Sequence, residues 1–292
     1  MKKEIKIIGE SIVDIYEFYK SEKYDDFLVP ICDKIETKQV AGGAAHFAKC
    51  LFNIINRNNY KIKFYTNEYY DRSYCATDIL NIVKNEDEFE IINSGYDKKN
   101  IIIKRIYINN KLFLRIDKGK NVDRKEDLIY NLIDNIKKDD IIIISNYHKG
   151  FLTDSDISNI ILKCNINKAI ICIDTKKLNF NYLEASLIKI NEKTARDFLE
   201  KNIFNYSKVL SKYFKSNVVV TLGEKGFNCC DSIIYKQSKN RTLKSYIDSI
   251  GAGDVFFAHL IKNFCLENRT LYESCIEANK YAKKSCQKIG TI

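Results

Sequence analysis

The sequence is short of the features that mark linkers, secreted proteins and membrane proteins. With one proline, Pro30, and 11 glycines among 292 residues, it has no proline-rich or glycine-rich linker. No apolar run approaches the roughly 20 residues that cross a membrane as a helix. The opening stretch MKKEIKIIGE interrupts its apolar positions with Glu4 and Lys6, unlike the core of a signal peptide. We therefore expect a cytoplasmic protein with no membrane partner.

The cysteines do not form a metal-binding or disulfide pattern. There are ten of them, yet no C-x-x-C occurs, and the adjacent pair Cys229-Cys230 is too close for an ordinary disulfide. Several lie in apolar runs, as Cys172 does in AIICID. This pattern favours free, buried thiols in a reducing compartment.

The charge excess does not form a block. Lys and Arg number 48 against 38 Asp and Glu, which gives a net charge of +10, but the lysines are spread along the whole chain. A nucleic-acid-binding arm would concentrate them. The charge therefore favours a solvated basic surface suited to small anions. Nucleic-acid binding is the less favoured alternative, because only the net charge supports it.

Apolar runs typical of buried strands alternate with helical patterns. This alternation predicts an α/β fold, with a mostly parallel sheet covered by helices on both faces. The predicted strands are 5–8, 62–65, 141–145, 169–173, 187–190 and 218–222. The predicted helices are 44–55, 125–137, 154–164, 192–200, 252–265 and 271–288.

Two segments depart from this alternation. Residues 12–38 lack clean helical periodicity, and residues 100–117 contain two β-rich runs around Asn109-Asn110, which predicts a hairpin with a tight turn. We expect these segments to form a small β-sheet lid inserted in the α/β body of a single domain that spans residues 1–292.

The stretch DSIGAGDVF, residues 248–256, precedes a predicted helix. Backbone N–H groups are unpaired at a helix N-terminus, and the helix dipole favours anions there. Gly251 and Gly253 have no Cβ, so an anionic ligand can approach this backbone closely. Asp254 is placed to accept a proton beside that site. The alternative for this stretch is a simple helix cap with a tight turn.

Other glycines follow predicted strands. Gly42-Gly43 precede a helix, Gly150 ends SNYHKG, and Gly223 and Gly226 lie in TLGEKG. Each alone is compatible with a turn, but together they predict ligand-binding turns at the ends of strands, where open α/β sheets bind ligands.

DSIGAGDVF resembles the D-x-x-G-A-G-D signature of the ribokinase (PfkB) carbohydrate kinase family. The resemblance covers nearly the whole chain, and it implies a ribokinase-like three-layer sandwich that uses ATP and Mg²⁺. The weaker matches are GESIVD (9–14), AGGAAHFA (41–48), TLGEKG (221–226) and ANKYA (278–282). SNYHKGFLT (145–153), RIYINNKLFLRID (105–117) and QKIGT (287–291) are similar to the kinases of D-glycero-D-manno-heptose 7-phosphate.

The resemblance assigns roles to particular positions. It implies that Asp254 is the catalytic base and that Gly251, Ala252 and Gly253 form the anion hole. The substrate-binding candidates are Asp14, Gly42, Gly43, Arg105, Asn146 and Lys149, with Arg105 and Lys149 assigned to the sugar's own phosphate or, alternatively, to a solvated surface. The cofactor-binding candidates are Asn191, Thr221, Gly223, Gly226, Asp248 and Asn279, with Asn191 ordering Mg²⁺ through water and no direct metal ligand assigned.

Four residues differ from the family pattern. Thr194 stands where the N-x-x-E motif has glutamate, and Glu10 replaces an aspartate. Asn146 and His46 differ at positions that would contact the sugar, so they bear on the substrate more than on the reaction. His46 is not expected to bind a metal.

The resemblance therefore implies an ATP-dependent sugar kinase. The favoured acceptor is the anomeric hydroxyl of D-glycero-D-manno-heptose 7-phosphate. Two alternatives stay open at this point: a kinase for another sugar or sugar phosphate, and a non-catalytic sugar- or nucleotide-binding protein on the same fold. Exposed strand edges and the apolar runs 101–103 and 112–114 also predict a homodimer through the lid.

Overall fold

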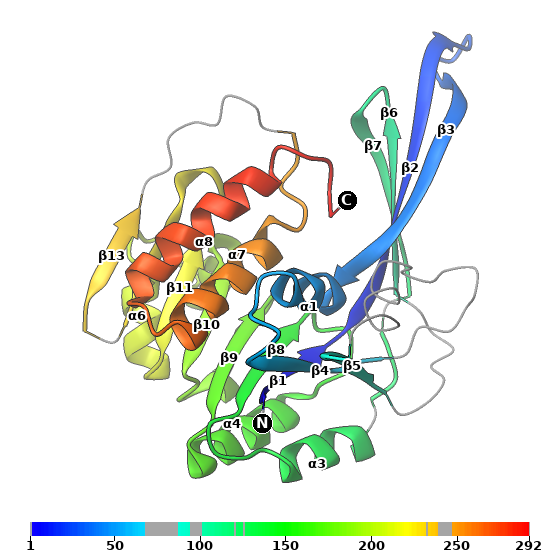
Figure 1. Cartoon of the computed structure of the whole chain (residues 1–292). Helices are drawn as coiled ribbons and strands as arrows, with labels where there is room; N and C mark the ends of the chain where they lie inside the picture. The colour runs from blue at the N-terminus through cyan, green and yellow to red at the C-terminus, as the bar shows by residue number, and fades with distance from the viewer. Residues whose placement is uncertain are drawn as a thin grey trace.

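The computed structural model describes residues 2–67, 87–93, 101–119, 121–124, 126–231, 233–238 and 247–291, and it contains two β-sheets (Figure 1). The larger sheet has nine strands in the order β13-β12-β11-β10-β9-β8-β1-β4-β5. Its strand pairs are parallel except for β11 with β12 and β12 with β13. The strands are β1 (Lys3–Gly9), β4 (Tyr60–Tyr65), β5 (Phe89–Ile92), β8 (Ile141–Asn146), β9 (Ile170–Thr175), β10 (Leu187–Asn191), β11 (Asn217–Thr221), β12 (Phe227–Cys230) and β13 (Tyr235–Ser238).

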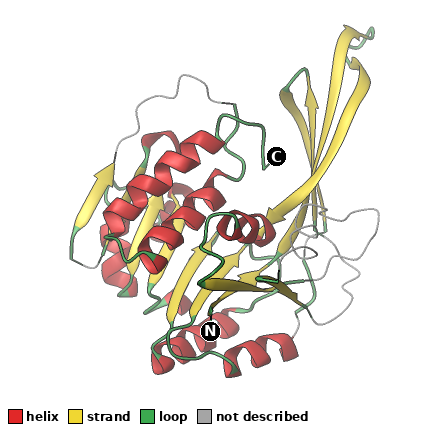
Figure 2. Cartoon of the chain, viewed as in Figure 1, coloured by secondary structure: helices red, strands yellow, loops and turns green. Residues whose placement is uncertain are grey.

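Helices cover both faces of this sheet (Figures 1 and 2). One face packs against α1 (Ala44–Phe52), α7 (Ala252–Ile261) and α8 (Leu271–Ser285). The other packs against α3 (Glu126–Asp134), α4 (Asp154–Asn167), α5 (Glu192–Leu199) and α6 (Tyr206–Phe214). Successive side chains of one strand enter different cores, as Ile7 and Ile8 of β1 do. This two-sided burial explains why the strands are apolar throughout.

The predicted three-layer α/β fold with a mostly parallel sheet is confirmed. Each of the six predicted strands and six predicted helices has a counterpart, within a few residues at its ends. The helix predicted to reach residue 265 is α-helical only to Ile261 and continues as a π-helical turn over Lys262–Leu266. Strands β5, β12 and β13 were missed, because strands of four residues are too short to show a period. Helix α6 was also missed.

The smaller sheet has four strands in the order β3-β2-β6-β7. The strands are β2 (Ser11–Tyr24), β3 (Pro30–Gly43), β6 (Ile102–Ile108) and β7 (Lys111–Lys118). Asn109 and Asn110 join β6 to β7 with φ of 49° and 63°, the left-handed values that a two-residue hairpin requires. Only Glu10 separates β1 from β2, and β3 runs directly into α1, so the small sheet extends from the edge of the body where β1 ends (Figure 1).

Within the described part of the chain, no helix has the length and apolar character needed to cross a membrane.

Candidate functional site

Two neighbouring cavities lie at the carboxyl ends of the central strands. The larger, of about 720 Å³, lies between the ends of β10 and β11 and the helices α7 and α8. The smaller, of about 210 Å³, lies between the small sheet and the N-terminus of α7. Lys176, Ser249 and Gly253 line both cavities, so a group bound in one lies next to a group bound in the other.

The N-terminus of α7 forms the boundary between them. Gly251 has a φ of 77°, and a Cβ there would lie 2.8 Å from Nε2 of His46 and 2.7 Å from Cγ2 of Thr291. Only glycine fits this position without strain. Ala252 and Gly253 follow in the first turn and line the larger cavity. The first-turn N–H groups of a helix favour an anion, but the N–H of Ala252 donates to the carbonyl of Ser249 over 3.2 Å, and the anion hole stays a prediction.

Asp254 lies in the same turn and lines the smaller cavity, with 7% of its surface exposed. The hydroxyl of Tyr147 donates a hydrogen bond of 3.0 Å to its Oδ1. Burial raises the pKa of Tyr147 well above its usual value, and the charge of Asp254 adds to the shift. Tyr147 therefore stays protonated and remains a donor to the carboxylate.

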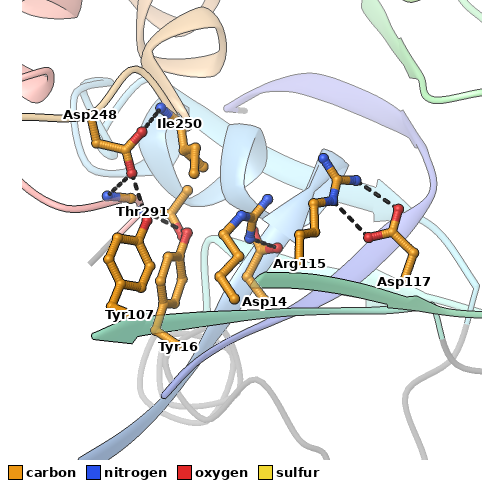
Figure 3. Close-up of polar contacts among 10 residues, drawn as sticks. Asp14, Tyr16, Tyr107, Arg115, Asp117, Asp248, Ile250 and Thr291 are labelled. Carbon is orange, nitrogen blue, oxygen red and sulfur yellow. Dashed lines mark hydrogen bonds and ion pairs between the residues drawn. The ribbon is translucent and has the colours of Figure 1, made fainter. Parts of the chain in front are cut away.

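On the opposite wall of the smaller cavity, Asp14 of β2 forms a buried ion pair with Arg105 of β6, with a distance of 2.6 Å between Oδ1 and Nη1 (Figure 3). Burial raises the pKa of Asp14, although Arg105 opposes the shift. A Cβ at Gly42 would lie 2.4 Å from Oδ2 of Asp14, so glycine at 42 makes room for this carboxylate. The guanidinium of Arg105 also lies over the ring of Tyr16. With 6% exposure, Arg105 is not the solvated surface charge of the alternative interpretation.

The other predicted substrate residues are arranged differently. Gly43 lines the smaller cavity and precedes α1. Asn146 at the end of β8 is buried, and its side chain contacts the hydroxyl of Tyr182 and the N–H of His148. Asn146 is not among the residues that line the smaller cavity. Lys149 is half-buried in the turn after β8. Its backbone N–H donates to Oε1 of Glu10.

The predicted nucleotide residues lie together, with one exception. Asn191, Thr221, Gly223, Gly226 and Asn279 all line the larger cavity.

The exception is Asp248, which is not among the lining residues of either cavity. Its carboxylate accepts hydrogen bonds from the hydroxyl of Tyr107 and from the N–H groups of Ile250 and Gly290 (Figure 3). Asp248 therefore ties the loop before α7 to strand β6 and to the C-terminal turn. We find no contact that would make it a nucleotide ligand.

Sequence reasoning missed two cations in the site. Lys189 of β10 is buried, lines the larger cavity, and donates to Asp174 over 2.9 Å. Burial lowers the pKa of Lys189, and Asp174 opposes this shift. Lys176 follows β9 and lines both cavities, and Asp174 raises its pKa. A lysine inside the apolar run LIKIN was the available signal for Lys189, because an isolated charge is seldom placed in a buried strand.

The three-layer body with a four-stranded sheet beside it is the ribokinase-like fold. Escherichia coli phosphofructokinase-2 in complex with potassium superposes with a TM-score of 0.76 at 13% identity, covering 98% of this chain and 94% of that one. Arabidopsis thaliana ribokinase complexed with ribose and ATP gives a TM-score of 0.70 at 15% identity, covering 99% of this chain and 94% of that one.

Residues 96–292 match the family described as pfkB family carbohydrate kinase, so the chain belongs to that family, as its motifs predicted. It is a sugar kinase, an enzyme that transfers a phosphoryl group. Curated relatives named Bifunctional protein HldE are 26% identical: the one from Helicobacter pylori strain J99 over 311 residues, the one from Campylobacter jejuni over 313. These alignments cover 99% and 100% of this chain but 64% and 62% of the relatives, so the chain spans just under two thirds of their length.

Proposed function

We propose that the protein transfers the γ-phosphate of ATP to a hydroxyl of a sugar phosphate, with the anomeric hydroxyl of D-glycero-D-manno-heptose 7-phosphate as the favoured acceptor. One observation carries the proposal. The buried carboxylate of Asp254 and the glycine-rich start of α7 lie side by side where the two cavities meet. The similarity of SNYHKGFLT, RIYINNKLFLRID and QKIGT to the heptose 7-phosphate kinases supports the heptose acceptor.

The chemistry follows from these positions. Asp254 accepts the proton of the sugar hydroxyl as its oxygen forms a bond to the γ-phosphorus, and the bond to the β-phosphate oxygen breaks to release ADP. The N-terminus of α7 at residues 251–253 would stabilise the charge that develops on the transferred group, with Gly251 and Gly253 as the donors, because the N–H of Ala252 donates to the carbonyl of Ser249. Lys176 and Lys189 supply positive charge on the side of the larger cavity.

The larger cavity suits a nucleotide. Its volume of about 720 Å³ falls in the range of small-molecule sites. Asn279 on α8 and the Gly223–Gly226 turn form its outer walls, where the base and ribose would lie. Lys189, whose Nζ lies 3.3 Å from an ideal Cβ at Gly253, and Lys176, which lines both cavities, lie near the N-terminus of α7, where the phosphates would lie.

Magnesium fits the donors present only as a water- and phosphate-held ion. No group of three His, Cys, Asp or Glu side chains capable of holding a metal occurs among the described residues. Asn191 caps α5 by accepting from the N–H of Thr194, and Glu192 lines the cavity beside it. These two residues would hold Mg²⁺ through water, and the ion would neutralise phosphate charge.

The acceptor's own phosphate has a candidate subsite next to the Asp14–Arg105 pair. Arg115 of β7 lies opposite Arg105 and pairs with Asp117 through two hydrogen bonds of 2.7 and 2.8 Å (Figure 3). Arg115 is the main cause that lowers the pKa of Asp117, and the charges of Lys149 and Arg105 contribute. Three cations therefore surround two carboxylates, which leaves a net positive charge for a phosphate.

ADP release from Mg-ATP with a panel of sugars and sugar phosphates tests the proposal. We expect turnover on heptose 7-phosphate and none on the sugar without its phosphate. Turnover on a different sugar would support the kinase assignment and show that the proposed acceptor is wrong. ATP binding with no turnover on any acceptor would favour the non-catalytic binding protein.

Arg115→Met tests the phosphate subsite. We expect the KM for the sugar phosphate to rise about 10- to 100-fold, the value of one lost charged hydrogen-bonding partner. The KM for ATP should not change, because Arg115 is not among the residues that line the larger cavity. Lys111→Met, at the other end of β7, removes an exposed charge as the control. Equal effects of the two substitutions would count against the subsite.

The proposal includes a homodimer through the small sheet. Strand β7 is an edge strand with all eight residues exposed, and Leu114 and Ile116 lie on the face opposite Arg115. Edge strands with exposed apolar residues favour pairing with another chain. We expect light scattering to report a dimer for the wild type and a monomer for Leu114→Glu. A monomeric wild type at micromolar concentration would refute this part.

A further inference from the structure

We propose that Tyr147 is a positioning residue for Asp254 and that Glu10 holds Tyr147 in place. This inference rests on the proposed function, because it assigns Asp254 as the base. It starts from a contact that the mechanism does not otherwise use, the hydrogen bond of 3.0 Å from the Tyr147 hydroxyl to Oδ1 of Asp254.

The turn that carries Tyr147 is fixed by buried polar side chains. Glu10, with 1% exposure, accepts the N–H of Tyr147 at Oε2 over 2.9 Å and the N–H of Lys149 at Oε1 over 2.8 Å. Oδ1 of Asn146 accepts the N–H of His148, which has a left-handed φ of 55°. Three successive amides are thus bound, so the backbone of Tyr147 has little freedom. The glutamate that departs from the family pattern has a defined task in this chain.

The phenol selects one oxygen of the carboxylate. Because Tyr147 occupies Oδ1, we assign Oδ2 of Asp254 to the sugar hydroxyl. The ammonium of Lys176 lies 4.8 Å from the ring centre of Tyr147 and covers it from the side of the larger cavity. The charged or titratable groups that act on Asp254 or Tyr147 are Asp14 of β2, Asp174 of β9, Lys176 after β9 and Lys189 of β10.

Tyr147→Phe removes the hydroxyl and keeps the ring. We expect kcat to fall about 10- to 100-fold, the value of one lost hydrogen bond to a charged group. The KM for ATP should stay within about twofold. The acid limb of the pH profile of kcat/KM should move to higher pH, because a hydrogen bond to a carboxylate favours its ionised form.

Tyr206→Phe is the matched control. Tyr206 of α6 is a buried tyrosine whose hydroxyl also donates to a single side chain, at Oδ1 of Asn202. This variant should keep the wild-type kcat and pH profile. Equal effects of both variants, or an unchanged pH profile in Tyr147→Phe, would overturn the proposal.

Glu10→Gln tests the second half of the inference. The single amide oxygen of glutamine cannot accept both N–H groups in the manner of the carboxylate. We expect Glu10→Gln to lower kcat, as Tyr147→Phe does. The kcat of the double variant should be no lower than that of Tyr147→Phe alone. Additive losses would show that Glu10 does not act through Tyr147.

An infrared difference spectrum between wild type and Asp254→Asn isolates the carboxylate band of Asp254 without any turnover. A shift of this band in Tyr147→Phe, and none in Tyr206→Phe, supports the hydrogen bond even for a protein that phosphorylates no tested sugar. An unmoved band would refute the positioning role, whatever the kinase assay shows.

Discussion

Asp254→Asn is expected to lower kcat by a factor of about 10² to 10⁴, the contribution of a general base. The asparagine side chain has nearly the same size but cannot accept the proton of the sugar hydroxyl. ATP binding should survive, because Asp254 lines the smaller cavity and is not among the residues that line the larger one.

Two measurements check this prediction: steady-state ADP release, and ATP affinity by calorimetry. Asp134→Asn, an exposed change at the end of α3, is the control for the loss of one carboxylate elsewhere. An Asp254→Asn enzyme with more than about a tenth of wild-type kcat would remove the general-base assignment. Loss of ATP affinity would instead indicate a damaged α7 N-terminus.

Lys176→Met should have the second-largest effect, a fall in kcat of about 10² to 10³, as is typical when one group that stabilises transition-state charge is removed. Among the lysines that the structure describes, Lys176 alone lines both cavities, so its ammonium can stay near the phosphoryl group during transfer from ATP to the acceptor. Asp174 raises the pKa of Lys176, so the charge is present throughout the working pH range.

Lys177→Met provides a close control, because it removes the neighbouring exposed lysine, which lines neither cavity. Single-turnover kinetics with saturating ATP separate the chemical step from binding. If Lys176→Met raised only the KM for ATP, Lys176 would bind the ground state and would not stabilise the transition state.

The fold was largely accessible from the sequence. Strands such as 141–145 are buried on both faces, so they had to be apolar throughout, and this made them visible. The glycines of the site were visible for a related reason. Positive φ at Gly43, Gly223, Gly226 and Gly251 leaves few other residues possible.

The polar contacts between distant segments were not accessible in this way. Nothing in the sequence joins Glu10 to Tyr147, 137 positions later, because that contact depends on β1 lying beside β8. The contacts of Asp248 were hidden for the same reason, since its partners Tyr107 and Gly290 lie 141 positions before it and 42 positions after it. Thr194 replaces a family glutamate, and its hydroxyl bonds to the carbonyl of Lys176, a use that only the folded chain reveals.

The contact between Gly42 and Asp14 also constrains how this enzyme could diverge. The carboxylate of Asp14 fills the space where a side chain at position 42 would begin, 2.4 Å from an ideal Cβ. Neither position can be substituted independently of the other. A larger residue at 42 would displace the carboxylate, and a smaller residue at 14 would leave a void beside Arg105. A change of acceptor that altered this wall of the cavity would therefore require substitutions at positions 14 and 42 together. Single substitutions would seldom produce it.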